Sequence, residues 1–270
     1  MKKITITNVT FDQAVKPAIL KKFRGAVIEH VLSQKQVFAS AEIATTVFHN
    51  HVEQVAVAAD DEEMVLPEKG GKGRYYHYPM IQYQLRHGKA AMTGIGPGAQ
   101  ALQFWMALAP DELQVHQKPF SLEVAEHHHS HWEPQIGNEL HTYRINKWLA
   151  FNAANHDEWK RTLRLHDKAQ LLDKRLWGHL CHLCDSLDIV LDKEKLELFV
   201  STIDHQCYRD CYGIQKLALD ITFQTNLNLP SEIGLGQGTT IGFGKVQGIT
   251  SKQQPQKRKV NFRKGSGAEE

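Results

Sequence analysis

The sequence predicts an α+β protein in which two ferredoxin-like sheets lie side by side. Stretches with alternating apolar and polar residues, typical of half-buried strands, are interspersed with stretches whose apolar residues recur every three or four positions, typical of helices. Periodicity alone predicts only the α+β class. The order of the expected elements is more specific. Each half of the chain contains, in succession, a strand, a helix, several strands, a second helix and further strands. That order fits a ferredoxin-like domain.

The composition is that of a soluble globular protein. Of the 270 residues, 41% are hydrophobic and 23% are charged, and this length holds one large domain or two of ordinary size. No apolar run approaches the ~20 residues of a membrane span, and the first residues alternate like a strand rather than a signal peptide. Four cysteines in so long a chain form no disulfide framework, which predicts a reducing, cytoplasmic location.

The net charge of +2 hides an uneven distribution. Residues 251–270 contain six Lys/Arg and two Glu, or +4, which leaves −2 for residues 1–250. This tail is polar, basic and without periodicity, so we expect it to be disordered. The expected parts are therefore a domain over residues 1–115, a second domain over residues 116–250, and the tail. Any affinity of the two domains for nucleic acid must come from local basic patches.

The N-terminal half is expected to begin with a strand over residues 2–11 and a helix over residues 17–31, since proline suits a first helical turn. One helical face is apolar and expected to be buried: Ile19, Leu20, Phe23, Ala26, Val27, His30 and Val31. Lys21, Lys22 and Arg24 lie off that face, where they form either a solvated surface or contacts for a phosphate backbone. The remaining expected elements are a short strand at 54–59, a charged loop at 60–73, a hairpin of 74–85 with 89–95, and a helix at 99–109.

The C-terminal half is expected to follow a boundary near residues 110–118. Asn155 and Glu158 have the spacing of a capping box, which predicts one long helix to about residue 186. Its expected apolar positions include Trp159, Leu163, Leu172, Leu176, Leu180, Leu183 and Leu187. The expected strands are 120–131, 141–151, 188–192, 196–205 and 217–226.

A glycine-rich loop closes the second domain. Five of the eleven residues from Gly234 to Gly244 are glycine. Glycine adopts positive φ easily and lets backbone N–H groups approach a ligand, so the loop could form an anion site with Lys245 at its exit. The spacing fits neither a Walker A loop nor a dinucleotide fingerprint. The alternative is a hairpin whose glycines serve turns and bulges, although a two- to five-residue hairpin turn does not need five of them.

Four stretches, taken together, resemble one protein family: VFHNH (47–51), YHYPMIQYQLRHGKAAMTGI (76–95), YRINKWLAFNAANHDEW (143–159) and IGLGQGTTIGFGKV (233–246). In this order they are similar to the CRISPR repeat-processing endoribonucleases of the repeat-associated RNA-binding (RAMP) superfamily. The resemblance covers nearly all of residues 1–250. It implies two ferredoxin-like domains side by side with a C-terminal glycine-rich loop.

RNA can be cut without a metal when its own 2′-OH attacks the adjacent phosphorus. This reaction needs a base, an acid and stabilisation of the phosphoryl charge. Histidine, with an ordinary pKa near ~6.5, can be the base or the acid, and an extended segment points His49 and His51 to one side. Among 16 histidines, about one such pair is expected by chance. The match at VFHNH is what singles out this pair.

The resemblance therefore implies a metal-independent endoribonuclease that cleaves CRISPR precursor RNA within its repeats, without cofactor or metal. Its products would carry a 2′,3′-cyclic phosphate and a 5′-OH, with His49 and His51 as acid and base in either order. The sequence gives no third catalytic residue. The RNA-binding candidates are Gly234, Gly236, Gly238, Gly242, Gly244, Lys245, Lys21, Lys22 and Arg24.

Several alternatives stay open. The chain could be a non-catalytic RNA-binding subunit of a CRISPR effector complex, or a histidine-rich, metal-dependent nuclease or metal carrier. The histidines of residues 127–131 could chelate Zn²⁺ or Ni²⁺, although a polar strand face is favoured. Cys181, Cys184, Cys207 and Cys211 could form a zinc ribbon, although buried thiols are favoured. The repeat sequence, its stem-loop or single-stranded form and the oligomeric state are not predicted.

Overall fold

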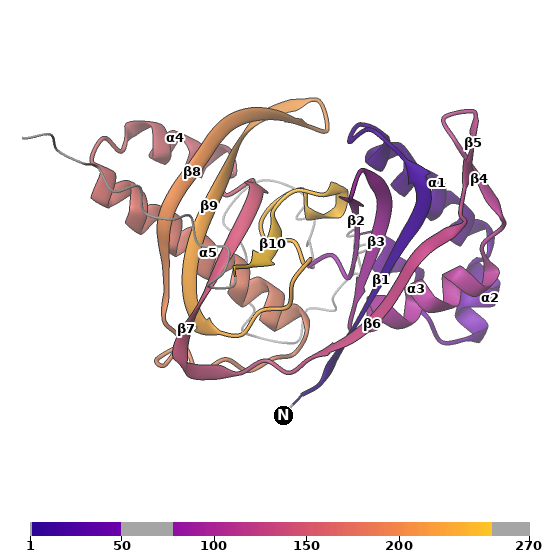
Figure 1. The fold of residues 1–270 in the computed structure, drawn as a ribbon, viewed down its shortest axis with the longest axis horizontal. Helices are drawn as coiled ribbons and strands as arrows, with labels where there is room; N and C mark the ends of the chain where they lie inside the picture. The colour runs from indigo at the N-terminus through magenta and orange to yellow at the C-terminus, as the bar shows by residue number, and fades with distance from the viewer. Residues whose placement is uncertain (1, 50–77, 250–270) are drawn as a thin grey trace, which may run out of the picture.

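The computed structural model describes residues 2–49 and 78–249. They form two four-stranded antiparallel sheets side by side, with α1, α2 and α3 on one outer flank and α4 on the other (Figure 1). The α+β prediction is thus confirmed. The strand expected at 54–59, the loop at 60–73 and the tail at 251–270 lie outside the described residues.

The N-terminal domain has the strand order β2-β3-β1-β6, in which the first strand lies between the third and the last, as in a ferredoxin-like sheet. Its elements are β1 (Ile4–Ala14), α1 (Ile19–Ser33), α2 (Lys35–Ser40), the 3₁₀ helix η1 (Thr45–Phe48), β2 (Ile81–Arg86), β3 (Lys89–Ile95), α3 (Pro97–Leu108), β4 (Glu112–Val115), β5 (Lys118–Ser121) and β6 (Val124–Trp132). The helix expected at 17–31 and the hairpin across residues 87–88 are confirmed as α1 and β2–β3.

Both faces of the N-terminal sheet are buried, because side chains alternate along a strand. On β1, Ile4 and Ile6 belong to a hydrophobic cluster shared with the C-terminal domain. Val9 and Phe11 belong to a second cluster, which contains Phe23, Val27 and other residues of α1. The sheet therefore separates two hydrophobic cores. The face that carries Ile4 and Ile6 is buried only because the second domain packs against it.

The C-terminal domain repeats this arrangement, with the strand order β10-β7-β9-β8. Its elements are β7 (Ile136–Trp148), α4 (Ala153–Arg161), α5 (Leu165–Ser186), β8 (Leu198–Cys211), β9 (Ile214–Leu227), the 3₁₀ helix η2 (Thr239–Ile241) and β10 (Lys245–Gly248). The loop between β9 and β10 contains only η2, where a ferredoxin-like domain would place its second helix. Because β9 and β10 both pair with β7 and not with each other, the glycine-rich loop is no simple hairpin turn.

The predicted domain boundary at residue 115 is wrong. The two sheets separate between Trp132 and Ile136, because β6 pairs with β1 along nearly its whole length. The segment near residues 110–118 looked like a linker, but it begins the β4–β5 hairpin, whose Leu113, Val115 and Phe120 are buried in the helix-side core.

The long helix predicted in the second half is also interrupted. Asn152, not Asn155, caps α4, and its side-chain oxygen accepts a hydrogen bond from the Asn155 backbone N–H at 2.9 Å. The chain leaves the helix at Thr162 and begins α5 at Leu165. Leu163, expected on the buried face, is 89% exposed at this break. Residues 188–192 form no strand.

The longest helix, α5, packs on β7 through a tryptophan–histidine contact. The indole N–H of Trp148 donates to Nδ1 of His179 at 3.1 Å, which fixes the proton of a neutral His179 on Nε2. Burial, assisted by the nearby charges of His182 and Arg175, lowers the pKa of His179 to about 4. The neutral ring is thus part of the folded structure.

We expect the free energy of unfolding to fall as the pH drops from about 6.5 to about 4, because the unfolded chain then binds a proton at residue 179 that the folded protein excludes. At about 1.4 kcal/mol per pKa unit, the loss is roughly 3 kcal/mol. Urea titrations across this range should show a shallower pH dependence for His179→Asn, whose amide oxygen can still accept from Trp148. Equal slopes for both proteins would contradict the assignment.

Candidate functional site

The glycine-rich loop lies between the two sheets and is hydrogen-bonded to the N-terminal domain. The buried hydroxyl of Tyr78 donates to the carbonyl oxygen of Gly234 at 2.7 Å. Gln82 binds both partners, since its Nε2 donates to the Tyr78 hydroxyl and its Oε1 accepts from the Gly234 N–H, each at 2.8 Å. Two side chains of the first domain thereby fix the beginning of the loop.

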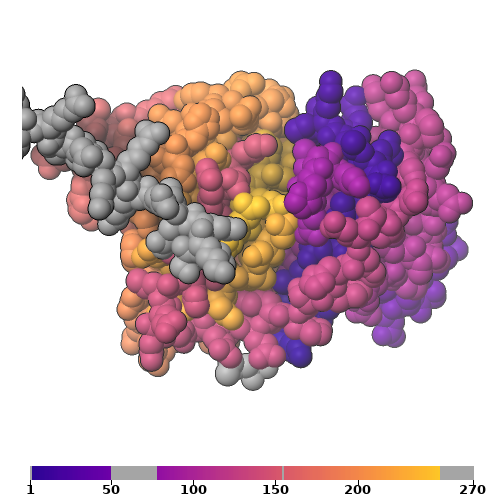
Figure 2. Space-filling model, viewed as in Figure 1, coloured from indigo at the N-terminus to yellow at the C-terminus, as the bar shows by residue number. Residues whose placement is uncertain are grey.

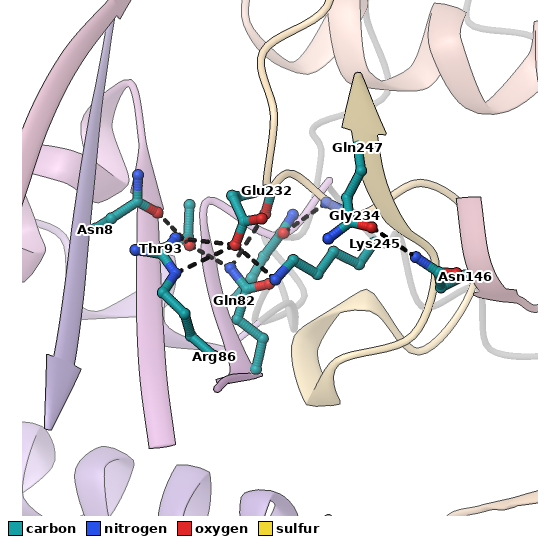
Figure 3. Close-up of polar contacts among 10 residues, drawn as sticks. Asn8, Gln82, Arg86, Thr93, Asn146, Glu232, Gly234, Lys245 and Gln247 are labelled. Atoms are coloured by element: carbon teal, nitrogen blue, oxygen red, sulfur yellow. Dashed lines mark hydrogen bonds and ion pairs between the residues drawn. The ribbon is translucent and has the colours of Figure 1, made fainter. Parts of the chain in front are cut away.

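Glu232, just before the loop, forms an ion triad across the domains (Figure 3). Its Oε2 lies 2.6 Å from Nζ of Lys245 on β10 and 3.0 Å from a guanidinium nitrogen of Arg86 on β2. All three side chains are largely buried. Burial by itself raises the pKa of Glu232, but the hydrogen bonds and charges of Lys245 and Arg86 outweigh it and hold the pKa below its ordinary value. The positive charge of Lys245 is therefore engaged within the protein.

A buried polar chain extends this contact into the first sheet (Figure 3). Nε2 of Gln84 donates to the backbone oxygen of Glu232 at 3.1 Å and also to the hydroxyl of Thr93. That hydroxyl in turn donates to Oδ1 of Asn8 at 2.7 Å. Strands β1, β3 and β2 are thus linked to the start of the glycine-rich loop through side chains.

Most glycines of the loop are required by packing inside the protein. Gly244 has φ +70°, and a Cβ there would overlap the carbonyl oxygen of Leu235. A Cβ on Gly236 would come within 2.7 Å of the Trp148 ring. The N–H groups of Gly234, Gly242 and Gly244 donate to acceptors within the protein, so these three do not form the expected anion cradle. A role of the loop glycines in RNA binding stays a prediction.

The three basic residues of α1 have different surroundings. Lys21 is exposed, and its Nζ lies 5.0 Å from the centre of the Tyr212 ring, at the tip of the β8–β9 hairpin. Lys22 is also exposed. Arg24 is half-buried, and its Nε is enclosed without a hydrogen-bond partner among the described residues.

His49 is positioned by the residue before it. Phe48 is fully buried and packs edge-on against Phe38 at 5.8 Å. His49 follows in an extended conformation and is half-buried. It lines a hollow of about 400 Å³ together with Leu32, Lys35, Ala39, Glu42, Ile43, Ala44, Thr45 and Thr46. His51 lies outside the described residues, so the geometry of the histidine pair stays a prediction.

The hollow at His49 and the glycine-rich loop are at opposite ends of α1. Leu32, near the end of this helix, lines the hollow, whereas a Cβ on Gly242 would lie 3.2 Å from Leu20, near its beginning. At 1.5 Å per residue, the 11 positions from Lys21 to Leu32 span about 16 Å. The structure therefore does not place His49 beside the loop.

The histidine-rich strand and the cysteines do not form a metal site among the described residues, where no three His, Cys, Asp or Glu side chains gather suitably. His127, His128, His129 and His131 are exposed on the edge strand β6. Nδ1 of His129 lies 3.0 Å from the hydroxyl of Thr7. Cys184 and Cys211 are buried free thiols in two different hydrophobic clusters.

Two family models match the chain in succession: the Cas6b N-terminal domain over residues 61–133 and the Cas6b C-terminal domain over residues 135–249. The chain belongs to the Cas6b family. The two matched segments meet between β6 and β7, where the sheets separate. The curated protein MJ0978 of Methanocaldococcus jannaschii, described as uncharacterized, is 30% identical over 103 residues, which are 38% of this chain and 67% of that protein.

Solved structures of Cas6 proteins share the fold. A crystal structure of Cas6b superposes with a TM-score of 0.70 at 19% identity, over 92% of this chain and 100% of that one. A structure of the CRISPR RNA processing endoribonuclease Cas6b gives 0.63 at 17% identity, with the same coverage. Csf5, a type IV Cas6 crRNA endonuclease, gives 0.53 at 10% identity, over 92% of this chain and 100% of that one. The double ferredoxin-like prediction is thus confirmed. The described residues include no helix long and apolar enough to span a membrane.

Sequence reasoning missed the N-terminal partners of the loop. Tyr78, Gln82 and Arg86 lie in a stretch that carried the family resemblance, yet none was predicted to contact the loop. The sequence did contain a signal, because polar side chains occupy every second position of β2 between apolar ones. These residues are Gln82, Gln84 and Arg86. Such a stripe on a buried strand indicates a polar partner, but not which one.

Replacing Gly244 with Ala should lower the free energy of unfolding by more than about 2 kcal/mol, because a strained φ and a backbone overlap act together. Gly213→Ala is the matched control, since Gly213 has φ +83° but no atom lies within 4 Å of the position that its Cβ would take. It should cost only about 1 kcal/mol. Chemical denaturation of both variants measures the difference. Equal costs would show that the overlap at Leu235 is relieved without penalty.

Proposed function

We propose that this Cas6b-family protein is an endoribonuclease that cleaves CRISPR precursor RNA within its repeats, without a metal, by attack of the RNA's own 2′-OH. His49 and His51 serve as acid and base, and the products carry a 2′,3′-cyclic phosphate and a 5′-OH. The observation that carries the proposal is the match of both Cas6b domain models over residues 61–133 and 135–249. Related solved structures described as CRISPR RNA endonucleases agree with it.

The surroundings of His49 suit this chemistry. Imidazole ordinarily titrates near neutral pH, so a half-buried histidine can transfer a proton in either direction. Lys35, Thr45 and Thr46 are among the residues that line the hollow beside it. A cation and hydroxyl donors there could bind the scissile phosphate and stabilise its developing charge. Lys35 is the candidate that the sequence did not indicate.

Replacing His49 with Ala should lower the single-turnover rate of repeat-RNA cleavage by roughly 10²-fold or more, the usual scale for general acid–base catalysis. Binding of the RNA should change little. His51→Ala should behave alike. His166→Ala is the control, because His166 is an exposed histidine in the first turn of α5, and it should leave the rate unchanged. Full activity of the double variant at positions 49 and 51 would eliminate this pair.

The route of cleavage has its own test, in which wild-type protein is incubated with repeat RNA in EDTA. We expect undiminished cleavage, and mass spectrometry should find the cyclic phosphate and the 5′-OH. A single 2′-deoxy nucleotide before the scissile phosphate should abolish cleavage, since the nucleophile is gone. Cleavage of that RNA, or loss of activity in EDTA, would contradict the mechanism. Tight binding without any cleavage would favour a non-catalytic RNA-binding subunit.

A further inference from the structure

A cleft of about 490 Å³ opens where the β8–β9 hairpin reaches the start of α1. The hairpin arches from the C-terminal domain towards the N-terminal domain (Figure 1), and the yellow C-terminal segment reaches the surface between the two domains (Figure 2). The polar and aromatic residues that matter here are Lys21, Asn146, Lys147, Arg209, Tyr212 and Phe243. The cleft therefore draws on both domains and on the glycine-rich loop.

Tyr212 is held in this cleft by a tight turn. Cys211 pairs with Ile214, which leaves Tyr212 and Gly213 as a two-residue hairpin loop. Both have positive φ, 57° and 83°, as in the type I′ turn that suits the twist of a hairpin. Tyrosine is an uncommon choice at positive φ, where Asn, Asp or Gly are preferred. The position therefore favours a role for the aromatic ring itself.

The ring is anchored and still accessible. Lys21 lies against the ring, and the Tyr212 hydroxyl is 3.4 Å from that of Thr240 in the loop. Nevertheless, Tyr212 is 43% exposed, a large value for an aromatic residue between two domains. An aromatic ring fixed in position but open to solvent is a surface on which a flat ring can stack.

The charges around the ring favour an anion. Lys21, Lys147 and Arg209 make no ion pair with any of the residues that the structure describes. The other cation of the cleft, Lys245, is already paired with Glu232. Of the described residues that line the cleft, Asp210 is the one acidic residue, and its Oδ1 accepts from the Gly213 N–H at 3.3 Å. Unpaired cations beside an exposed ring are the combination that binds single-stranded nucleic acid.

We propose that Tyr212 stacks on one unpaired base of the bound RNA, while Lys21, Lys147 and Arg209 bind the flanking phosphates. This inference rests on the proposed function and adds to it a nucleotide subsite separate from the catalytic hollow. Because the cleft and His49 lie at opposite ends of α1, the stacked base is not the nucleotide that carries the scissile phosphate. The subsite thus contributes to affinity and to the choice of cleavage position.

The test uses repeat RNA from the CRISPR array of the source genome, made uncleavable by one 2′-deoxy nucleotide, so that binding is measured apart from catalysis. Tyr212→Ala should raise the Kd roughly 5- to 100-fold, the range expected for loss of one base–aromatic stack. Tyr212→Phe should bind as the wild type does. Tyr208→Ala is the matched control, since Tyr208 is a comparably exposed tyrosine of the same hairpin that contacts His156 and does not line the cleft.

The stacked nucleotide can be located directly. With 2-aminopurine placed at each unpaired position in turn, one position should be quenched by wild type and Tyr212→Phe but not by Tyr212→Ala. Tyr212→Leu keeps an apolar side chain and should still lose the quenching. Melting temperatures check that each variant is folded, and Tyr212→Leu carries the comparison if Tyr212→Ala unfolds.

The outcomes separate the two proposals. If wild-type protein cleaves normal repeat RNA but Tyr212→Ala and Tyr208→Ala bind the uncleavable RNA equally well, the stacking subsite is wrong and the proposed function stands. Weaker binding by Tyr212→Phe as well would also overturn stacking, because it would assign the effect to the hydroxyl. If wild-type protein binds but does not cleave, the endoribonuclease proposal fails while the subsite can still be confirmed.

Discussion

The arrangement of the two domains depends on one carboxylate. Glu232 lies between Arg86 of the first sheet and Lys245 of the second, and all three charges are largely removed from water. Burying any one of them alone would be costly, whereas the central carboxylate offsets part of the cost of burying both cations. The compensation exists only when β2 and β10 are at the observed separation. The triad therefore selects one relative position of the domains, whatever its net contribution to stability.

Local patterns predicted the elements that local physics determines. Helix α1 followed from its apolar face, and the β2–β3 hairpin followed from His87-Gly88 between two strand-like stretches. The break between α4 and α5 could not be predicted, because no proline or glycine lies in residues 162–164. Only the packing shows it, with Trp159 and Leu172 buried while Leu163 is 89% exposed. The boundary error has the same origin, since only the pairing of β6 with β1 reveals which sheet β6 completes.

The candidate site shows the same limit at longer range. The sequence located the glycine-rich loop but not its role, because the groups that contact it, Tyr78 and Gln82, are about 150 residues away in the chain. The glycine content correctly indicated that other atoms lie close to the backbone of the loop. Those atoms belong to the protein itself and not to a ligand. His49 was predicted from the family resemblance, and the structure adds the reason for its position, which is the burial of the neighbouring Phe48.

The shared core has a consequence for any attempt to divide the molecule. Ile4, Ile6, Ile95 and Trp132 of the first sheet belong to the same hydrophobic cluster as the buried leucines of α5. Neither half, expressed alone, could bury that face, so each fragment would expose a large apolar surface and tend to aggregate. The two sheets resemble separate modules in outline, yet the shared cluster couples their folding.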